Sequence, residues 1–341
     1  MIQSLNTLRA LAAFIVVITH YSKSTGLFNG FVGRGSGQMG VMLFFMISGF
    51  LMAYLYLEEN KPFAWLNVKN YLISRASRVL PLYLILVLCS FISKQINDSV
   101  VLYNIPDTSS LLSHLLLLNG VSVFWTIPPE IHFYIFFIIL WLFYSTKKVM
   151  MLLVLITSFI FASYLGFPRY SGNLGALHYD FFFLRSLPYF LTGVLLGLLY
   201  RRFQFSKDIQ NGAYLITLII LPLLFPDVFE FIFGYRHGLW QDIHVLVMIT
   251  IVFVCFVFLT PKNHWFVSNP IGNFLGKISY SVYLLHMPVL KHFKELGKNN
   301  PELYLFFFII CTILIAYLSY LFIEKPSRDF LNKKYKKSKN N

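Results

Sequence analysis

Ten apolar segments recur along this chain, and short polar stretches separate most of them. Each is close to the length that an α-helix needs to cross a bilayer. Of the 341 residues, 57% are hydrophobic and only 12% charged, about half the charge of a soluble domain. We therefore predict an all-α, polytopic transmembrane helical bundle of about ten spans, at residues 5–22, 40–57, 79–96, 130–145, 149–166, 183–200, 211–226, 243–260, 271–292 and 303–323.

The positive charges predict an orientation and a domain plan. Ten spans divide the loops into two sets, and the set that shares its side with the termini holds 17 Lys and Arg against 8 in the other. Because cytoplasmic loops carry the excess of these residues, both termini should be cytoplasmic. We expect one transmembrane domain over residues 1–330 and a basic cytoplasmic tail over 331–341, which suits anionic membrane lipid and not nucleic acid. The apolar stretch 108–120 is too short to span, so we expect it to be re-entrant or interfacial.

Two polar residues stand out inside the first apolar segment, Arg9 and His20. An arginine within a membrane helix is costly and needs a reason. Eleven residues of α-helix make about three turns, so the two side chains share one face, roughly 16 Å apart along the axis. They cannot form an ion pair. We expect Arg9 near the inner surface and His20 near the outer one.

His20 is the candidate general base, since neutral imidazole can accept a proton from a hydroxyl near pH 7. Glu130 opens the fourth span after two prolines, where an acid suits a helix N-terminus. We expect it at the depth of His20, where a carboxylate would orient the imidazole. Tyr134 shares the face of Glu130. The structural alternatives are helix packing for His20 and helix capping for Glu130.

Further candidates for substrate contact lie on the same expected outer side. His286 lies in the outer half of the ninth span, with Tyr280 and Tyr283 at helical spacing to it, although packing and a helix bend before Pro288 would also explain this histidine. Trp125 belongs to an aromatic-rich outer loop that is either an interfacial belt or a sugar platform. Arg185 lies just inside the sixth span and needs a partner.

A basic face is predicted on the inner side. Arg75 and Arg78 are three residues apart at the entry of the third span, and Arg9 lies just below the same surface. Guanidinium groups bind phosphate oxygens well, so three of them indicate a polyanionic cytoplasmic ligand. The alternative is that these arginines only set the orientation of the protein in the membrane. The three cysteines are isolated in apolar runs, so no metal site is predicted, and Gly193 with Gly197 forms a GxxxG pair that favours close helix packing.

Together these segments resemble the acyltransferase-3 family of integral membrane O-acyltransferases. In order, the resemblance rests on Arg9 with His20, the run FFMISGF at 44–50, Arg75 and Arg78 with Pro81 and Tyr83, Trp125 with Glu130 and Tyr134, Arg185 before FLTGVLLG, ISYSVYLLH ending at His286, and IEKP at 323–326. It implies transfer of an acyl group, usually acetyl, from cytoplasmic acyl-coenzyme A (CoA) to a hydroxyl of an envelope or exported carbohydrate or glycolipid, such as exopolysaccharide or O-antigen. It also implies a multi-pass protein of the bacterial inner membrane, and of the stand-alone type without a fused esterase-like domain.

The resemblance gives the candidate residues their expected roles. Acetyl-CoA or another acyl-CoA would be held by Arg9, Arg75 and Arg78, and His20 with Glu130 would deprotonate the acceptor. An acyl-histidine intermediate is the alternative chemistry. Two other functions stay open: a polysaccharide or lipid transporter, and a non-catalytic partner in envelope assembly. Transporters often contain inverted repeats, and no clear repeat is present in the sequence. The oligomeric state is not predicted.

Overall fold

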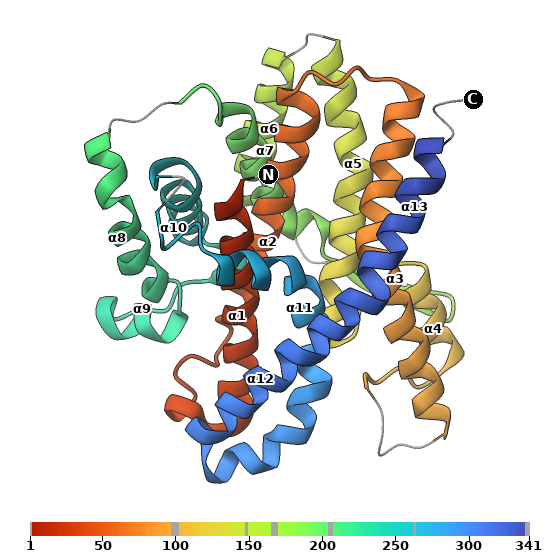
Figure 1. Cartoon of the computed structure of the whole chain (residues 1–341), viewed down its shortest axis with the longest axis vertical. Coiled ribbons are helices and arrows are strands. Elements are labelled where there is room, and N and C mark those ends of the chain that lie inside the picture. Colours follow the sequence, from red (N-terminus) through yellow and green to blue (C-terminus); the bar gives the residue numbers. More distant parts are fainter. Residues whose placement is uncertain are drawn as a thin grey trace.

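The computed structural model describes residues 2–96, 102–146, 149–164, 170–203, 207–261 and 264–337. Some residues used in the charge count or in the domain plan lie outside these ranges, namely Lys147, Lys148, Arg169, Lys262 and the end of the tail, 338–341. The described part is a helical bundle (Figure 1) with helices α1 (Gln3–Thr25), α2 (Gly37–Met52), α3 (Trp65–Ile96), α4 (Thr108–Leu115), α5 (Ile127–Ser145), α6 (Val149–Tyr164), α7 (Phe183–Leu199), α8 (Lys207–Leu223), α9 (Pro226–Phe233), α10 (Ile243–Val254), α11 (Pro270–Asn299), α12 (Pro301–Ser319) and α13 (Lys325–Lys337).

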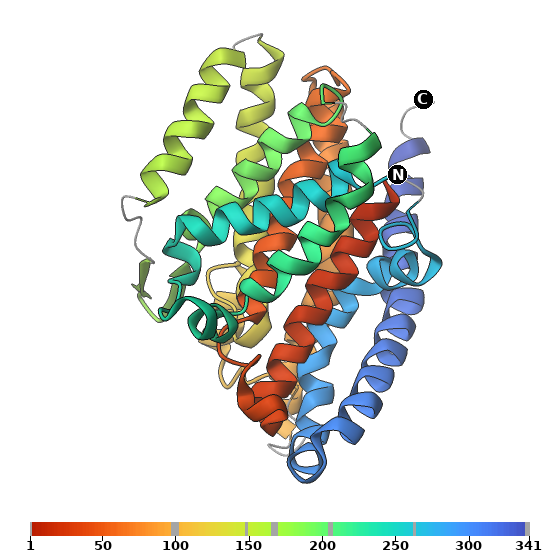
Figure 2. The same cartoon turned by 90° about the vertical axis from the view of Figure 1, so that its left-hand side faces the viewer.

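Each expected span coincides with a helix, but ten membrane crossings are not confirmed. Among the described residues, five helical stretches are long and apolar enough to cross a membrane: Gln3–Thr25, Gly37–Glu58, Trp65–Ile96, Ser122–Ser145 and Pro301–Leu331. A sixth would be the pair formed by α8 and α9, which is bent by 91°. The start of α1 and the end of α13 lie toward the same end of the molecule (Figure 2), and their cytoplasmic location stays a prediction.

Four helices form the centre of the bundle. The first, α1, packs against α2 and α11, while α2 also packs against α7. Glycines allow the backbones to approach: a Cβ atom on Gly193 would lie 2.1 Å from the carbonyl oxygen of Met46, and one on Gly197 would lie 2.6 Å from that of Phe50. Close packing at the GxxxG pair is therefore confirmed.

The all-α prediction misses one hairpin. Strands β1 (Tyr170–Leu174) and β2 (Leu177–Phe181) pair antiparallel, with Tyr170 opposite Phe181. The turn between them includes Gly175, whose φ of +63° suits a residue without a Cβ. The backbone N–H of Asp180 donates to the carbonyl oxygen of Leu118 at 2.9 Å, which fastens the hairpin to the segment after α4.

The short apolar stretch 108–120 does not form a span. Helix α4 has eight residues, and the chain then turns and continues as a 3₁₀ turn, Ser122–Thr126, directly into α5. His114 fixes this turn: its Nδ1 lies 2.7 Å from the carbonyl oxygen of Ser110, and its Nε2 accepts the backbone N–H of Val121 at 3.0 Å. Residues 116–126 are thereby brought into the bundle ahead of α5, where Phe124 and Thr126 are buried.

Candidate functional site

Two adjoining cavities run through the centre of the bundle. We call the first the arginine cavity, which is lined by Arg9, Phe44, Ser48, Arg78, Thr126, Glu130, Ser279, Tyr280 and Tyr283, among others. The second is the histidine cavity, lined by Val16, Thr19, His20, Lys23, Gln38, Trp125, Asp180, Arg185, Trp240 and Tyr283, among others. Val41 and Tyr283 line both, so these two side chains lie where one cavity meets the other.

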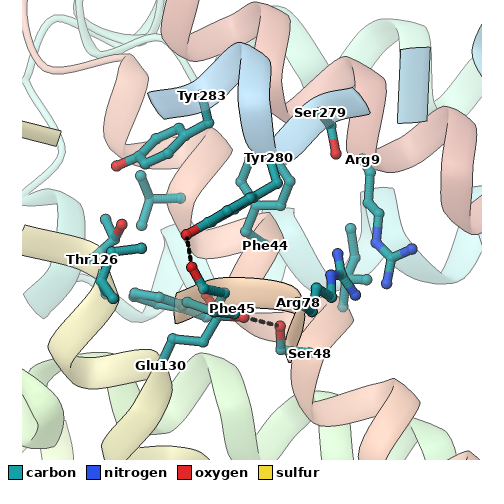
Figure 3. Close-up of a pocket in the computed structure, with 14 residues that line it drawn as sticks. Arg9, Phe44, Phe45, Ser48, Arg78, Thr126, Glu130, Ser279, Tyr280 and Tyr283 are labelled. Atoms are coloured by element: carbon teal, nitrogen blue, oxygen red, sulfur yellow. Dashed lines mark hydrogen bonds between the residues drawn. The ribbon is translucent and has the colours of Figure 1, made fainter. Parts of the chain in front are cut away.

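The arginine cavity is narrow and carries a cluster of guanidinium groups. Figure 3 shows Arg9 from α1 and Arg78 from α3 approaching each other on one side, with Glu130 from α5 across from them. Arg9 interacts electrostatically with Arg78, Arg75 and Glu130, so the three arginines lie together as predicted. The cavity volume is only about 40 Å³, which is too small for a sugar ring.

The guanidinium groups have few protein partners. Arg9 is 4% exposed, and its one hydrogen bond in the described part of the chain is with the side-chain oxygen of Asn6 at 3.3 Å. The Nε atom of Arg75 is buried without an acceptor. Within the described ranges, none of Arg9, Arg75 and Arg78 forms an ion pair at contact distance. Buried donors of this kind require an acceptor, and an anion with several oxygens would supply one.

Glu130 belongs to this cluster and not to His20. One of its carboxylate oxygens accepts hydrogen bonds from the hydroxyl of Ser48 at 3.2 Å and from that of Tyr134. The expectation that Glu130 orients His20 is therefore wrong. The physical reason is the path of the chain: Gly120 and Val123 line the histidine cavity, whereas Thr126 and Glu130 line the arginine cavity, so α5 starts deep in the bundle.

The partner of His20 is His286 of α11. Its Nε2 lies 2.8 Å from the Nδ1 of His20, and the rings meet edge to edge in nearly one plane, with centroids 5.1 Å apart and planes 8° apart. His286 is fully buried, and its Nδ1 lies 2.7 Å from the carbonyl oxygen of Tyr283. On α1, Val16, Thr19, His20 and Lys23 all line the histidine cavity, a spacing that confirms a single polar face.

The far wall of the histidine cavity combines aromatic rings with polar groups. Trp240 stacks edge to face with Trp125 at 5.7 Å, and its indole N–H donates to Gln38. The guanidinium of Arg185 lies 5.0 Å from the Trp240 ring and 3.4 Å from Gln38. At about 420 Å³, this cavity has a volume typical of small-ligand sites. Aromatic faces beside planar polar groups suit a sugar, whose rings present C–H faces and hydroxyl edges.

The remaining predicted residues divide between the two cavities. Tyr280 lines the arginine cavity, where its hydroxyl donates to the carbonyl oxygen of Val79 at 2.6 Å, and Tyr134 is buried beside Glu130. Trp125 and Arg185 line the histidine cavity.

Sequence reasoning missed Lys23, Gln38 and Trp240 in the histidine cavity. Lys23 is one turn beyond His20 on the predicted face, so the helical spacing would have found it. No local pattern marks Gln38 or Trp240.

Several of the described helices are able to cross a membrane. The bundle encloses a buried guanidinium cluster and a cavity lined by His20, so it is an integral membrane protein with polar groups in its interior. The chain belongs to the acyltransferase-3 family, whose model, described as an acyltransferase domain, matches residues 2–323.

Several curated proteins are similar to the chain. It is 28% identical to a protein named "Putative O-acetyltransferase" of Staphylococcus aureus (strain COL), over 96% of this chain and 57% of that protein. It is 27% identical to "Putative peptidoglycan O-acetyltransferase YrhL" of Bacillus subtilis (strain 168), over 96% and 55%. A "Putative acetyltransferase" of Acidianus two-tailed virus is 26% identical over 74% and 72%. The chain thus spans less than two thirds of its first bacterial relatives, and no solved structure matches it.

Proposed function

We propose that this protein is a membrane O-acetyltransferase that takes an acetyl group from cytoplasmic acetyl-CoA and transfers it to a hydroxyl of an envelope carbohydrate. Its place in the acyltransferase-3 family and the names of its relatives support acyl transfer. The observation that carries the mechanism is the junction of the two cavities at Val41 and Tyr283, because it connects a phosphate-type site to a site with a general base.

The donor is assigned to the arginine cavity by charge and shape. CoA combines a phosphate-rich head with a long thin arm. The buried, largely unpartnered guanidinium groups of Arg9, Arg75 and Arg78 suit the phosphates. The arm would pass along the narrow apolar space beside Phe44, with its thioester directed toward Tyr283. Glu130 would hold Tyr134 and Ser48 in place and offset part of the positive charge.

The acceptor is assigned to the histidine cavity. A sugar would stack on Trp125 or Trp240, and Gln38 and Arg185 would bind its oxygens. His20 would then accept the proton of the acceptor hydroxyl as its oxygen attacks the thioester carbonyl carbon. The carbon–sulfur bond breaks, and the proton on His20 passes to the departing thiolate. The products are the O-acetyl ester and free CoA, and the histidine returns to its starting state.

The name of the Bacillus subtilis relative makes a peptidoglycan sugar the first acceptor to test. Polymers such as exopolysaccharide or O-antigen present the same kind of hydroxyl and belong in the same test.

The test uses membrane vesicles from bacteria that express the chain, supplied with radiolabelled acetyl-CoA. We expect label in a base-labile ester on envelope carbohydrate, and only in inverted vesicles, which expose their cytoplasmic face to the added donor. His20→Ala should reduce the label about 10²- to 10⁴-fold, which is the usual contribution of a general base. His292→Ala, at an exposed position on α11, is the matched control. Undiminished ester formation by His20→Ala at equal protein level would overturn the proposed mechanism.

A further inference from the structure

The hydrogen bonds of His286 determine which nitrogen of His20 can act as a base. The Nδ1 of His286 lies 2.7 Å from the carbonyl oxygen of Tyr283 and 3.2 Å from that of Val282. A carbonyl oxygen only accepts hydrogen bonds, so Nδ1 of His286 carries the proton. In the neutral ring, Nε2 of His286 is then an acceptor.

The acceptor on His286 fixes the tautomer of His20. The Nδ1 of His20 lies 2.8 Å from that Nε2, so Nδ1 must be the protonated nitrogen of His20. The remaining nitrogen of His20, Nε2, keeps its lone pair, on a side chain that lines the histidine cavity. With the opposite tautomer, two lone pairs would face each other at 2.8 Å.

We propose that His286 is the positioning residue of His20: it holds the ring in the tautomer that presents Nε2 to the acceptor, and it stabilises the imidazolium that forms during transfer. This inference rests on the proposed function of His20. The role matches the one that a carboxylate has in a Ser–His–Asp triad. Here the residue that positions the base is a neutral imidazole, which is hydrogen-bonded to a backbone carbonyl. Unlike a carboxylate, it adds no charge to the interior of the bundle.

The surroundings of His286 fit this role. The residue is fully buried, and the described cavities do not include it among their lining side chains, so it is placed to act through His20 and not on a substrate. The α11 segment that carries it is held from several sides. Tyr283 donates to the carbonyl oxygen of Val123 at 3.0 Å, and Tyr103 donates to that of Leu284. The hydrogen-bonded geometry of the two rings is therefore set by the fold before substrate binds.

The first test replaces His286 in two ways. Gln keeps an acceptor oxygen that can receive the Nδ1–H of His20, whereas Leu removes the acceptor. We expect His286→Leu to lower kcat about 100-fold, and His286→Gln to recover much of that loss. The KM for acetyl-CoA should stay within about twofold in both. In the His20→Ala background, His286→Leu should cause no further loss, because the two residues act as a unit.

The second test reads the position of the proton in the wild-type protein and uses a variant only to assign the signals. Solid-state NMR of the ¹⁵N-histidine-labelled protein in lipid, with the His20 signals assigned by their loss in His20→Asn, reports which ring nitrogen carries the proton. At neutral pH we expect a protonated Nδ1 and an unprotonated Nε2. A protonated Nε2 would overturn the inference even if His286→Leu failed to fold.

The outcomes separate this inference from the proposed function. Full activity of His20→Ala would remove the general base, and the proposed function with it. An inactive His20→Ala together with a folded, fully active His286→Leu would remove only the positioning role of His286.

Discussion

The phenolic hydroxyl of Tyr283 donates a hydrogen bond to the carbonyl oxygen of Val123 at 3.0 Å, and this contact holds the Tyr283 ring at the junction of the two cavities. The partner carbonyl belongs to the 3₁₀ turn that leads into α5. The α11 side chain at the junction is thus held by a backbone group more than a hundred residues earlier in the chain.

Opening this junction should uncouple the donor from the acceptor. We expect Tyr283→Ala to raise acceptor-independent hydrolysis of acetyl-CoA several-fold relative to transfer, because water from the histidine cavity would then reach the thioester. Tyr283→Phe keeps the ring and should leave that ratio near the wild-type value. Release of free CoA thiol with and without acceptor membranes measures the ratio. An unchanged ratio in Tyr283→Ala would show that the ring does not separate the cavities.

Removing a guanidinium from the cluster of Arg9, Arg75 and Arg78 should weaken donor binding selectively. We expect Arg75→Ala to raise the KM for acetyl-CoA about tenfold or more, since a charge-assisted hydrogen bond contributes about 1.5–3 kcal/mol. The KM for the acceptor should change little. Arg202→Ala removes the same side chain from an exposed position and serves as the control. Equal donor constants in the two variants would remove Arg75 from the donor site.

The contact between α2 and α7 should be intolerant of a single added methyl group. In Gly193→Ala, the new Cβ would lie 2.1 Å from the carbonyl oxygen of Met46, and backbone cannot yield as a flexible side chain would. Overpacking typically costs about 1–3 kcal/mol, so we expect a clear fall in the thermal midpoint of the solubilised protein. Gly212→Ala in α8 meets open space and should have little effect. Similar midpoints for both variants would contradict the close approach.

His114 predicts a pH dependence of stability. Burial lowers the pKa of His114 below its ordinary value of 6.5, against an opposing hydrogen bond to Ser110. Because the folded-state pKa lies below the unfolded one, its contribution is complete above about pH 6.5 and is lost as the pH falls further. His114→Gln should therefore unfold several degrees lower at pH 7.5, and the gap to wild type should narrow at pH 5.5. A gap of constant size would show that His114 does not titrate on unfolding.

The sequence predicted the helices well because their signal is local. Each apolar run is long enough to identify its own helix, and the shared face of Arg9 and His20 follows from helical geometry alone. The clustering of Arg9 with Arg75 and Arg78 was also predicted, since hydropathy places all three near the inner ends of their expected spans.

The pairing inside the site could not be predicted in the same way. His20 and His286 are 266 residues apart, and they meet only because α1 packs on α11. Glu130 was assigned to the wrong partner because its depth was counted from a helix start at the membrane surface. The chain instead enters the bundle along residues 116–126, held by His114, before α5 begins. Depth in a bundle depends on such irregular segments, which hydropathy does not describe.

The packing of α1 against α11 also bears on how the protein is made. Of the five stretches able to cross a membrane, α1 belongs to the least apolar, and it carries a buried arginine. It leaves the ribosome well before its main partner, which starts only at Pro270. During most of translation, the insertion machinery must therefore shelter Arg9 from lipid. Helix α1 thus gains its most extensive contact late, and the paired imidazoles form only when α11 has been made.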